Sequence, residues 1–132
     1  MHITIDTKQL QQTLEIVSKV STKHITLPVL QCVLLEVKDK TLFIRATNLE
    51  IGIEGSIPVQ TEEDGIIAVP AGILLQTVHL ITQPTVILTT EGEVLHIETK
   101  HSKTEIKSIP ASEFPHIPKI SGNPITIQST LF

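Results

Sequence analysis

Hydrophobic and polar residues follow two different periods along the first half of the chain. Residues 2–5 alternate with a period of two, as a short β-strand does. Leu10, Leu14 and Val17 then recur at the spacing of one face of an α-helix, and Asp6 is a suitable N-cap for that helix. Three further strands are predicted, over residues 29–37, 41–46 and 50–59.

The same order of elements returns in the second half, after an acidic stretch at residues 62–65 that predicts a loop. Residues 66–69 predict a strand, and Pro70 suits the start of a helix because its missing N–H is not needed there. Three more strands are expected, over residues 85–89, 93–98 and 103–109. The sequence therefore predicts an α+β domain of two tandem βαβββ units, with two helices packed on antiparallel sheets.

A proline-rich segment at residues 110–118 predicts an extended connector after these two units. Beyond it, residues 124–129 (PITIQS) resemble residues 2–7 (HITIDT) at a constant offset. We therefore expect one domain over residues 1–120, with residues 121–132 forming a linker and the truncated start of a second copy of that domain.

Composition restricts the class of protein. The chain has 132 residues, 40% of them hydrophobic, and contains neither Trp nor Tyr, which suits one domain with an aliphatic core. Its one cysteine, Cys32, lies in an apolar run and is expected to be buried. No secretory signal opens the chain, and no apolar run approaches the ~18 residues of a membrane span. We therefore expect a soluble, cytoplasmic protein.

Residue patterns that mark catalytic sites are absent from the sequence. The six histidines are scattered among different elements, no glycine-rich phosphate loop occurs, and no serine lies in a nucleophile-elbow pattern. A third hypothesis is a metal-dependent enzyme that uses His96, Glu98 and His101. It requires these side chains to converge, because zinc sites usually need three or four ligands. The sequence thus predicts a non-enzymatic binding scaffold that needs no cofactor or metal.

The distribution of charges along the chain indicates more about function than the formal net charge of −4 does. The first predicted helix and the loop after it carry more bases than acids, whereas the predicted strands and loops hold most of the acids. A neutral-to-basic helical face can contact DNA phosphates without reading the base sequence, and the lack of aromatic residues on that face argues against stacking on single-stranded bases. The alternative is that this distribution is accidental. The candidate DNA-facing residues are Lys8, Gln12, Lys19, Lys23 and His24.

The last predicted strand carries Lys103, Glu105 and Lys107 on one face. Lysines on a strand are typical of a sheet edge that is protected from aggregation. The same charges would equally suit an edge that pairs with a strand of another subunit. Both interpretations stay open, and the second supports an alternative hypothesis for the whole chain, namely a protein-interaction module that assembles through this edge and has no role on DNA.

Five short segments, taken in order, resemble one protein family. They are residues 26–30 (TLPVL), 34–37 (LLEV), 46–51 (ATNLEI), 68–71 (AVPA) and 109–115 (IPASEFP). Together they are similar to the bacterial sliding clamp, the β subunit of DNA polymerase III, and they extend over nearly the whole chain.

This resemblance implies a function without covalent chemistry or cofactor. Members of the family have three such domains, and two subunits close head-to-tail into a ring around duplex DNA, with helices lining the hole and sheets outside. The ring tethers the replicative polymerase and is loaded by a clamp loader. By this resemblance the chain is the first domain, and the peptide-binding pocket of the third domain lies outside it.

The resemblance also suggests roles for individual residues. The position where relatives often carry a DNA-contacting arginine is His24 here, with Lys23 beside it, and Gly72 and Ile73 replace basic residues that relatives can carry. The final strand forms the subunit interface in relatives. The corresponding interface candidates are His101, Lys103, Thr104 and Ile106, with Thr104 standing where a larger apolar residue can occur.

Overall fold

The computed structural model describes residues 1–19, 28–48 and 51–114. Two α-helices, nine strands and two short 3₁₀ helices occur in these ranges. In chain order they are β1 (His2–Asp6), α1 (Thr7–Val17), η1 (Pro28–Gln31), β2 (Cys32–Lys38), β3 (Thr41–Thr47), β4 (Gly52–Pro58), β5 (Gln60–Glu63), β6 (Gly65–Pro70), α2 (Ala71–His79), β7 (Thr85–Glu91), β8 (Val94–Glu98), β9 (Lys103–Lys107) and η2 (Ala111–Glu113).

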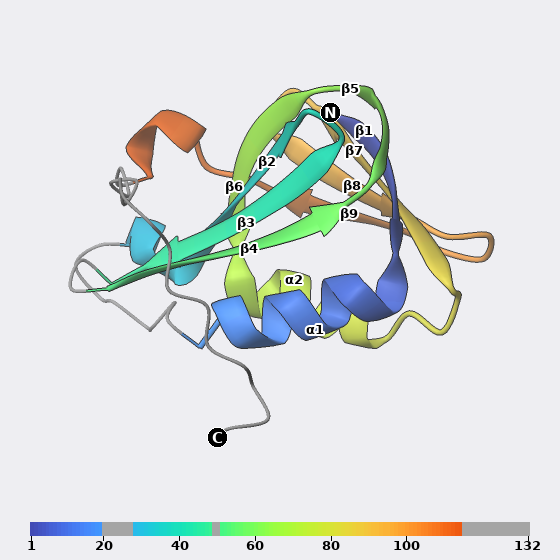
Figure 1. The fold of residues 1–132 in the computed structure, drawn as a ribbon, viewed down its shortest axis with the longest axis horizontal. Helices are drawn as coiled ribbons and strands as arrows, with labels where there is room; N and C mark the ends of the chain where they lie inside the picture. Colours follow the sequence, from blue (N-terminus) through green and yellow to red (C-terminus); the bar gives the residue numbers. More distant parts are fainter. Residues whose placement is uncertain (20–27, 49–50, 115–132) are drawn as a thin grey trace, which may run out of the picture.

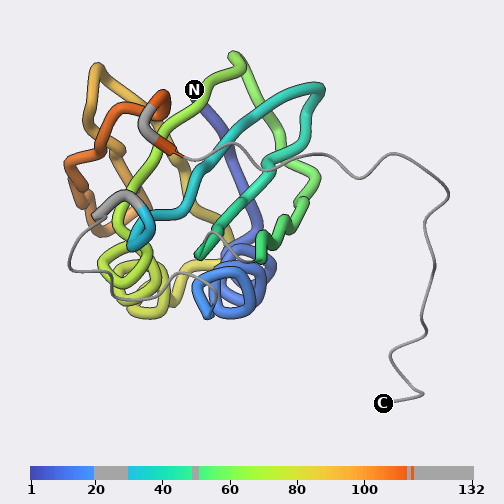
Figure 2. The backbone as a smooth tube through the Cα atoms, turned by 90° about the vertical axis from the view of Figure 1, so that its left-hand side faces the viewer, coloured from blue at the N-terminus to red at the C-terminus, as the bar shows by residue number. Residues whose placement is uncertain are grey.

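The strands form two antiparallel sheets, and both helices lie side by side along one side of the molecule (Figure 1 and Figure 2). One sheet has the strand order β5-β1-β7-β8-β9 and the other has the order β4-β3-β2-β6. The first strand of each unit joins the sheet of the other unit, because β1 pairs with β7 and β6 pairs with β2. This exchange confirms the predicted α+β fold of two tandem βαβββ units and relates them by an approximate twofold symmetry.

Each helix buries one apolar stripe beneath the sheets. In α1 the stripe contains Leu10, Leu14 and Val17, as the periodicity predicts, and Asp6 caps the helix by accepting a hydrogen bond from the Gln9 backbone N–H at 3.0 Å. Pro70 ends β6 and lies just before the first residue of α2. The core between helices and sheets is therefore built from both halves of the chain.

Two contacts fix the position of α1. The Gln11 side chain donates hydrogen bonds from Nε2 to the backbone carbonyls of Val78 at 2.9 Å and Ile81 at 3.4 Å, and so joins α1 to the end of α2. On its other flank, α1 lies so close to β4 that a Cβ atom on Gly55 would be 2.5 Å from Cγ2 of Thr13. Glycine is the residue that permits this approach of strand to helix.

The predicted acidic loop at residues 62–65 is wrong, because Gln60–Glu63 forms strand β5. It pairs with β1, so that Ile3 lies opposite Thr61. The Glu63 carboxylate accepts a hydrogen bond from the α-amino group of Met1 at 3.0 Å. An edge strand can be polar on both faces, and for this reason the acidic composition did not reveal it.

The described part of the proline-rich connector is packed against the domain, in contrast to the extended linker that the sequence predicts. The Ile109 backbone N–H donates to the carbonyl of Ala68 at 3.0 Å. Phe114, only 8% exposed, packs with Leu34 and Ala68 on the outer face of the second sheet. The remainder of the connector, the predicted domain boundary at residue 120 and the repeated segment at residues 124–129 lie outside the described residues.

Several strands begin or end at other residues than the sequence predicts. The strand expected from residue 29 begins at Cys32 after η1, and the one expected from residue 50 begins at Gly52. The final strand ends at Lys107, after which Ile109 makes only an isolated bridge to β6.

Candidate DNA-facing surface and sheet edge

Two of the three described candidates for DNA contact lie on one ridge of the first helix, and the third lies just beyond its end. Lys8, Gln12 and Lys19 are all exposed, and at 100° per residue the spacing of Lys8 and Gln12 places them about 40° apart around the helix axis. The buried stripe of α1 contains none of them, and α1 itself lies on the side of the molecule that the two helices form (Figure 1). Lys19 lies two residues after the end of α1, and its backbone N–H donates to the carbonyl of Ile16 at 3.3 Å. Lys23 and His24 lie outside the described residues.

The second helix contributes little charge to this side. Between Ala71 and His79 it carries no Lys, Arg, Asp or Glu. Its exposed positions include Ile73, at 53% exposure, and Leu80 directly after the helix, at 82%. The cationic part of the helical side therefore follows α1, and the ridge also holds one acid, the exposed Glu15.

Acidic side chains gather on the sheets and their turns. Arg45 on β3 is held there between two of them, with Nη1 2.7 Å from Glu36 and Nε bonded to Glu54. Burial disfavours its charge, but the hydrogen bonds that it donates to both carboxylates, and their negative charges, outweigh this effect and raise the pKa of Arg45. The guanidinium also lies 5.4 Å from the centre of the Phe43 ring. This arginine is thus neutralised within the sheet, and the sheet side remains acidic.

Strand β9 is the last strand of its sheet, so no strand of the described residues pairs with its outer side. The predicted interface residues differ in their accessibility. Lys103 and His101 are exposed, Thr104 is half-buried, and Ile106 is 4% exposed and belongs to the core. Lys103 lies 3.9 Å from Glu98 on the neighbouring strand. This edge therefore offers backbone groups and a mixed row of charges to a partner strand.

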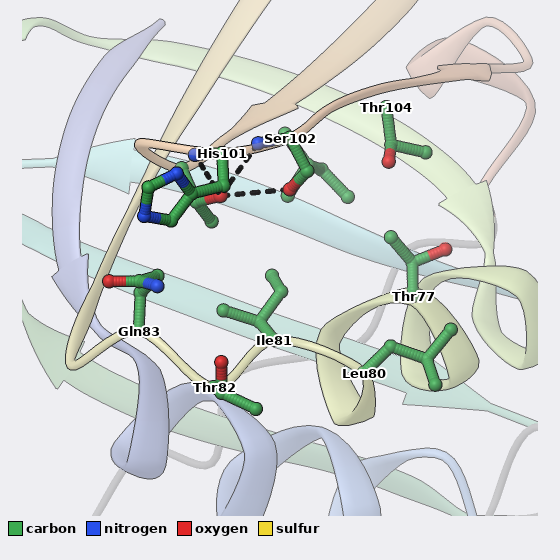
Figure 3. Close-up of a pocket in the computed structure, with 10 residues that line it drawn as sticks. Thr77, Leu80, Ile81, Thr82, Gln83, His101, Ser102 and Thr104 are labelled. Atoms are coloured by element: carbon green, nitrogen blue, oxygen red, sulfur yellow. Dashed lines mark hydrogen bonds between the residues drawn. The ribbon is translucent and has the colours of Figure 1, made fainter.

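A pocket of about 530 Å³ lies beside this edge, between the end of α2 and the β8–β9 hairpin (Figure 3). Two of the interface candidates, His101 and Thr104, line it. The hairpin is held by a hydrogen bond between the hydroxyls of Thr99 and Ser102 at 2.8 Å. The other lining residues are Thr77, Leu80, Ile81, Thr82, Gln83 and Ile97.

Sequence reasoning missed the contribution of α2 to this pocket. The signal was present in the repeat, because an offset of 64 residues aligns the two helices and matches Thr13 with Thr77 and Ile16 with Leu80. In the first unit the corresponding flank of the helix is filled by the close contact with Gly55. In the second unit the flank is open.

The structure does not support the hypothetical metal site of His96, Glu98 and His101. The two nitrogens of His96 lie 3.4 Å from Glu91 and 3.5 Å from Glu105. Within residues 1–19, 28–48 and 51–114, no group of three or more His, Cys, Asp or Glu side chains could hold a metal ion. Cys32 is buried as predicted, and burial raises the pKa of its thiol. No helix in the described ranges is long and apolar enough to span a membrane.

The arrangement of helices and sheets is that of a DNA-clamp domain. The crystal structure of the DNA polymerase III subunit beta from Pseudomonas aeruginosa superposes with a TM-score of 0.85 at 30% sequence identity, covering 93% of this chain and 34% of that chain. The DNA polymerase III beta subunit from Thermotoga maritima gives a TM-score of 0.84 at 28% identity, with 92% and 34% covered.

Sequence comparison identifies the family. Residues 1–118 match the family described as DNA polymerase III beta subunit, N-terminal domain, and the chain belongs to that family. The beta sliding clamp of Pseudomonas aeruginosa is 30% identical over 125 residues, covering 93% of this chain and 34% of the relative. The chain thus spans about a third of the length of the relatives that it matches, and the resemblance seen in its sequence motifs is confirmed.

Proposed function

We propose that this chain is the first domain of a sliding clamp, a processivity factor that encircles duplex DNA and tethers the replicative polymerase. The observation that supports this proposal is the difference in charge between the two sides of the domain. Its helical side bears a ridge with exposed Lys8 and Lys19, whereas its sheet side is acidic. A ring built with helices inward would present bases to the phosphates and acids to the solvent.

Weak contact with DNA is what this function requires. A topological link keeps the ring on DNA, so that phosphate contacts need only centre the duplex. Lys8 and Lys19, with Gln12 between them, supply such contacts without any reading of base sequence, and we propose Lys23 and His24 as further contacts after the helix. Contacts of this kind weaken steeply as salt rises.

Ring closure is proposed at the β9 edge. A strand of the partner subunit would extend the sheet beyond β9, where Lys103 and His101 are exposed and Thr104 faces the pocket. Ile106 of β9 is buried in the core and would hold the strand in the register that this pairing needs. Two subunits joined in this way would form a homodimeric ring.

The remaining parts of the proposal concern the longer protein. Residues 1–120 would form the first domain and residues 121–132 the linker and the start of the second, which the likeness of residues 124–129 to residues 2–7 supports. The polymerase and the clamp loader would bind the full-length protein in the cytoplasm. The chain would take no part in covalent chemistry.

An NMR titration of this chain with a short DNA duplex tests the DNA-facing surface. We expect weak binding, with chemical-shift changes at Lys8, Gln12 and Lys19 that disappear between 50 and about 200 mM salt. The sheet residue Arg45 is an internal control and should not respond. Tight binding that is insensitive to salt, or shift changes centred on the sheets, would contradict the proposal and favour a protein-interaction module.

A further inference from the structure

We infer that Glu15 weakens the hold of the helical surface on DNA and so helps the ring to slide. This inference rests on the proposed function. Glu15 is exposed and lies on the same ridge of α1 as Lys8 and Gln12, at the spacing i, i+4 and i+7 from Lys8, and the exposed Lys19 lies two residues beyond the helix. A phosphate row that follows this ridge from Lys8 to Lys19 therefore also passes the Glu15 carboxylate.

The charge of this ridge is small, so that a single acid matters. Among the described residues of α1 and α2, Lys8 is the lysine inside a helix and Glu15 is the acid, while Lys19 lies two residues after α1. Removing the carboxylate would raise the formal charge of the ridge from +1 to +2, as counted from Lys8, Lys19 and Glu15. The aligned position in the second helix is His79, which carries no negative charge.

Helix stability does not explain the acid at this position. Glu15 lies in the last turn of α1, which ends at Val17, and a negative charge there opposes the helix dipole. Within the described part of the chain, no ion pair joins Glu15 to Lys19, although a spacing of four residues would permit one. The side chain is exposed and contributes nothing to the core. A neutral glutamine would serve the helix at least as well.

The consequence concerns the strength of binding rather than its location. The lysines attract the phosphates, and the carboxylate between them offsets part of that attraction at close range, where screening by salt is incomplete. Surface contact then stays weak along the whole duplex, and the ring is held by topology. We therefore expect the residue to limit affinity and to speed diffusion along DNA.

The test compares two substitutions of equal charge change in the full-length protein. Glu15→Gln removes the acid on the ridge, and Glu62→Gln removes an exposed acid on β5, on the sheet side. The affinity of each unloaded protein for a short linear duplex is measured at 50 and about 200 mM NaCl. We expect Glu15→Gln to bind about 2- to 5-fold more tightly at low salt, with a smaller gain at high salt. Glu62→Gln should match the unsubstituted protein.

Additional measurements distinguish a failure of this inference from a failure of the proposed function. Thermal unfolding verifies that both variants fold, and Lys19→Gln should weaken binding at low salt. If Lys19→Gln weakens binding but Glu15→Gln behaves as Glu62→Gln does, the inference is overturned while the DNA-facing surface stands. A gain for Glu15→Gln that does not change with salt also overturns it. If Lys19→Gln has no effect either, the proposed DNA-facing surface itself fails.

Discussion

Individual side chains, more than any motif, join the two halves of this domain. Gln11 is the clearest case, because it reaches from α1 to two backbone carbonyls at the end of α2. Its neighbour Gln12 is exposed on the outer ridge. The sequence does not distinguish the two glutamines, since the burial of one appears only once the helices are placed side by side.

We predict that Gln11→Ala destabilises the domain by about 1–2 kcal/mol, because the part-buried side-chain hydrogen bonds to the carbonyls of Val78 and Ile81 are lost. Gln12→Ala is the matched control and should change the free energy of unfolding by less than about 0.5 kcal/mol. Urea unfolding followed by circular dichroism measures both. Equal effects of the two substitutions would show that the bridge between the helices contributes nothing to stability.

The candidate site residues were predictable to different degrees. Helical periodicity and lysine content were enough to place Lys8 and Lys19 on one surface, because the register of an amphipathic helix is readable from sequence. The alternation of residues places Ile106 on the face opposite Lys103 and Lys107. That it is only 4% exposed and belongs to the core appears only once the strand is packed.

At the scale of elements, the order of helices and strands along the chain was predicted better than the polar strand β5. The tight turn between β2 and β3 contains Asp39 and Lys40, with φ values of 53° and 60°. These left-handed values suit a two-residue hairpin turn in which glycine is preferred at the second position. Strand β5 escaped prediction because its acidic residues carry no hydrophobic alternation, and its pairing with β1 depends on the fold as a whole.

We predict that Lys40→Gly stabilises the domain by about 0.5–1 kcal/mol, since glycine adopts the left-handed conformation without the strain that a side chain brings. Lys38→Gly, two residues earlier in β2, should have the opposite sign and a similar size, because glycine weakens an ordinary strand. Differential scanning calorimetry of both variants provides the comparison. A loss of stability for Lys40→Gly would contradict this account of the turn.

At the scale of the whole molecule, the approximate twofold symmetry explains both the predictability of the fold and its limits. Each half repeats the same order of elements, so that the pattern of one half supports the interpretation of the other. The exchange of β1 and β6 between the sheets is not written in either half alone. The symmetry is broken where function is proposed, by the charges on α1 and by the open flank between α2 and β9.

The central claim is that the full-length protein is held on DNA by topology. The most direct measurement loads the protein onto a nicked circular plasmid with its clamp loader and follows its retention by gel filtration before and after the plasmid is cut once. We predict retention on the circle at a salt concentration that abolishes surface binding, and release once the DNA has ends. Equal retention on circular and linear DNA, or equal loss from both, would contradict the claim.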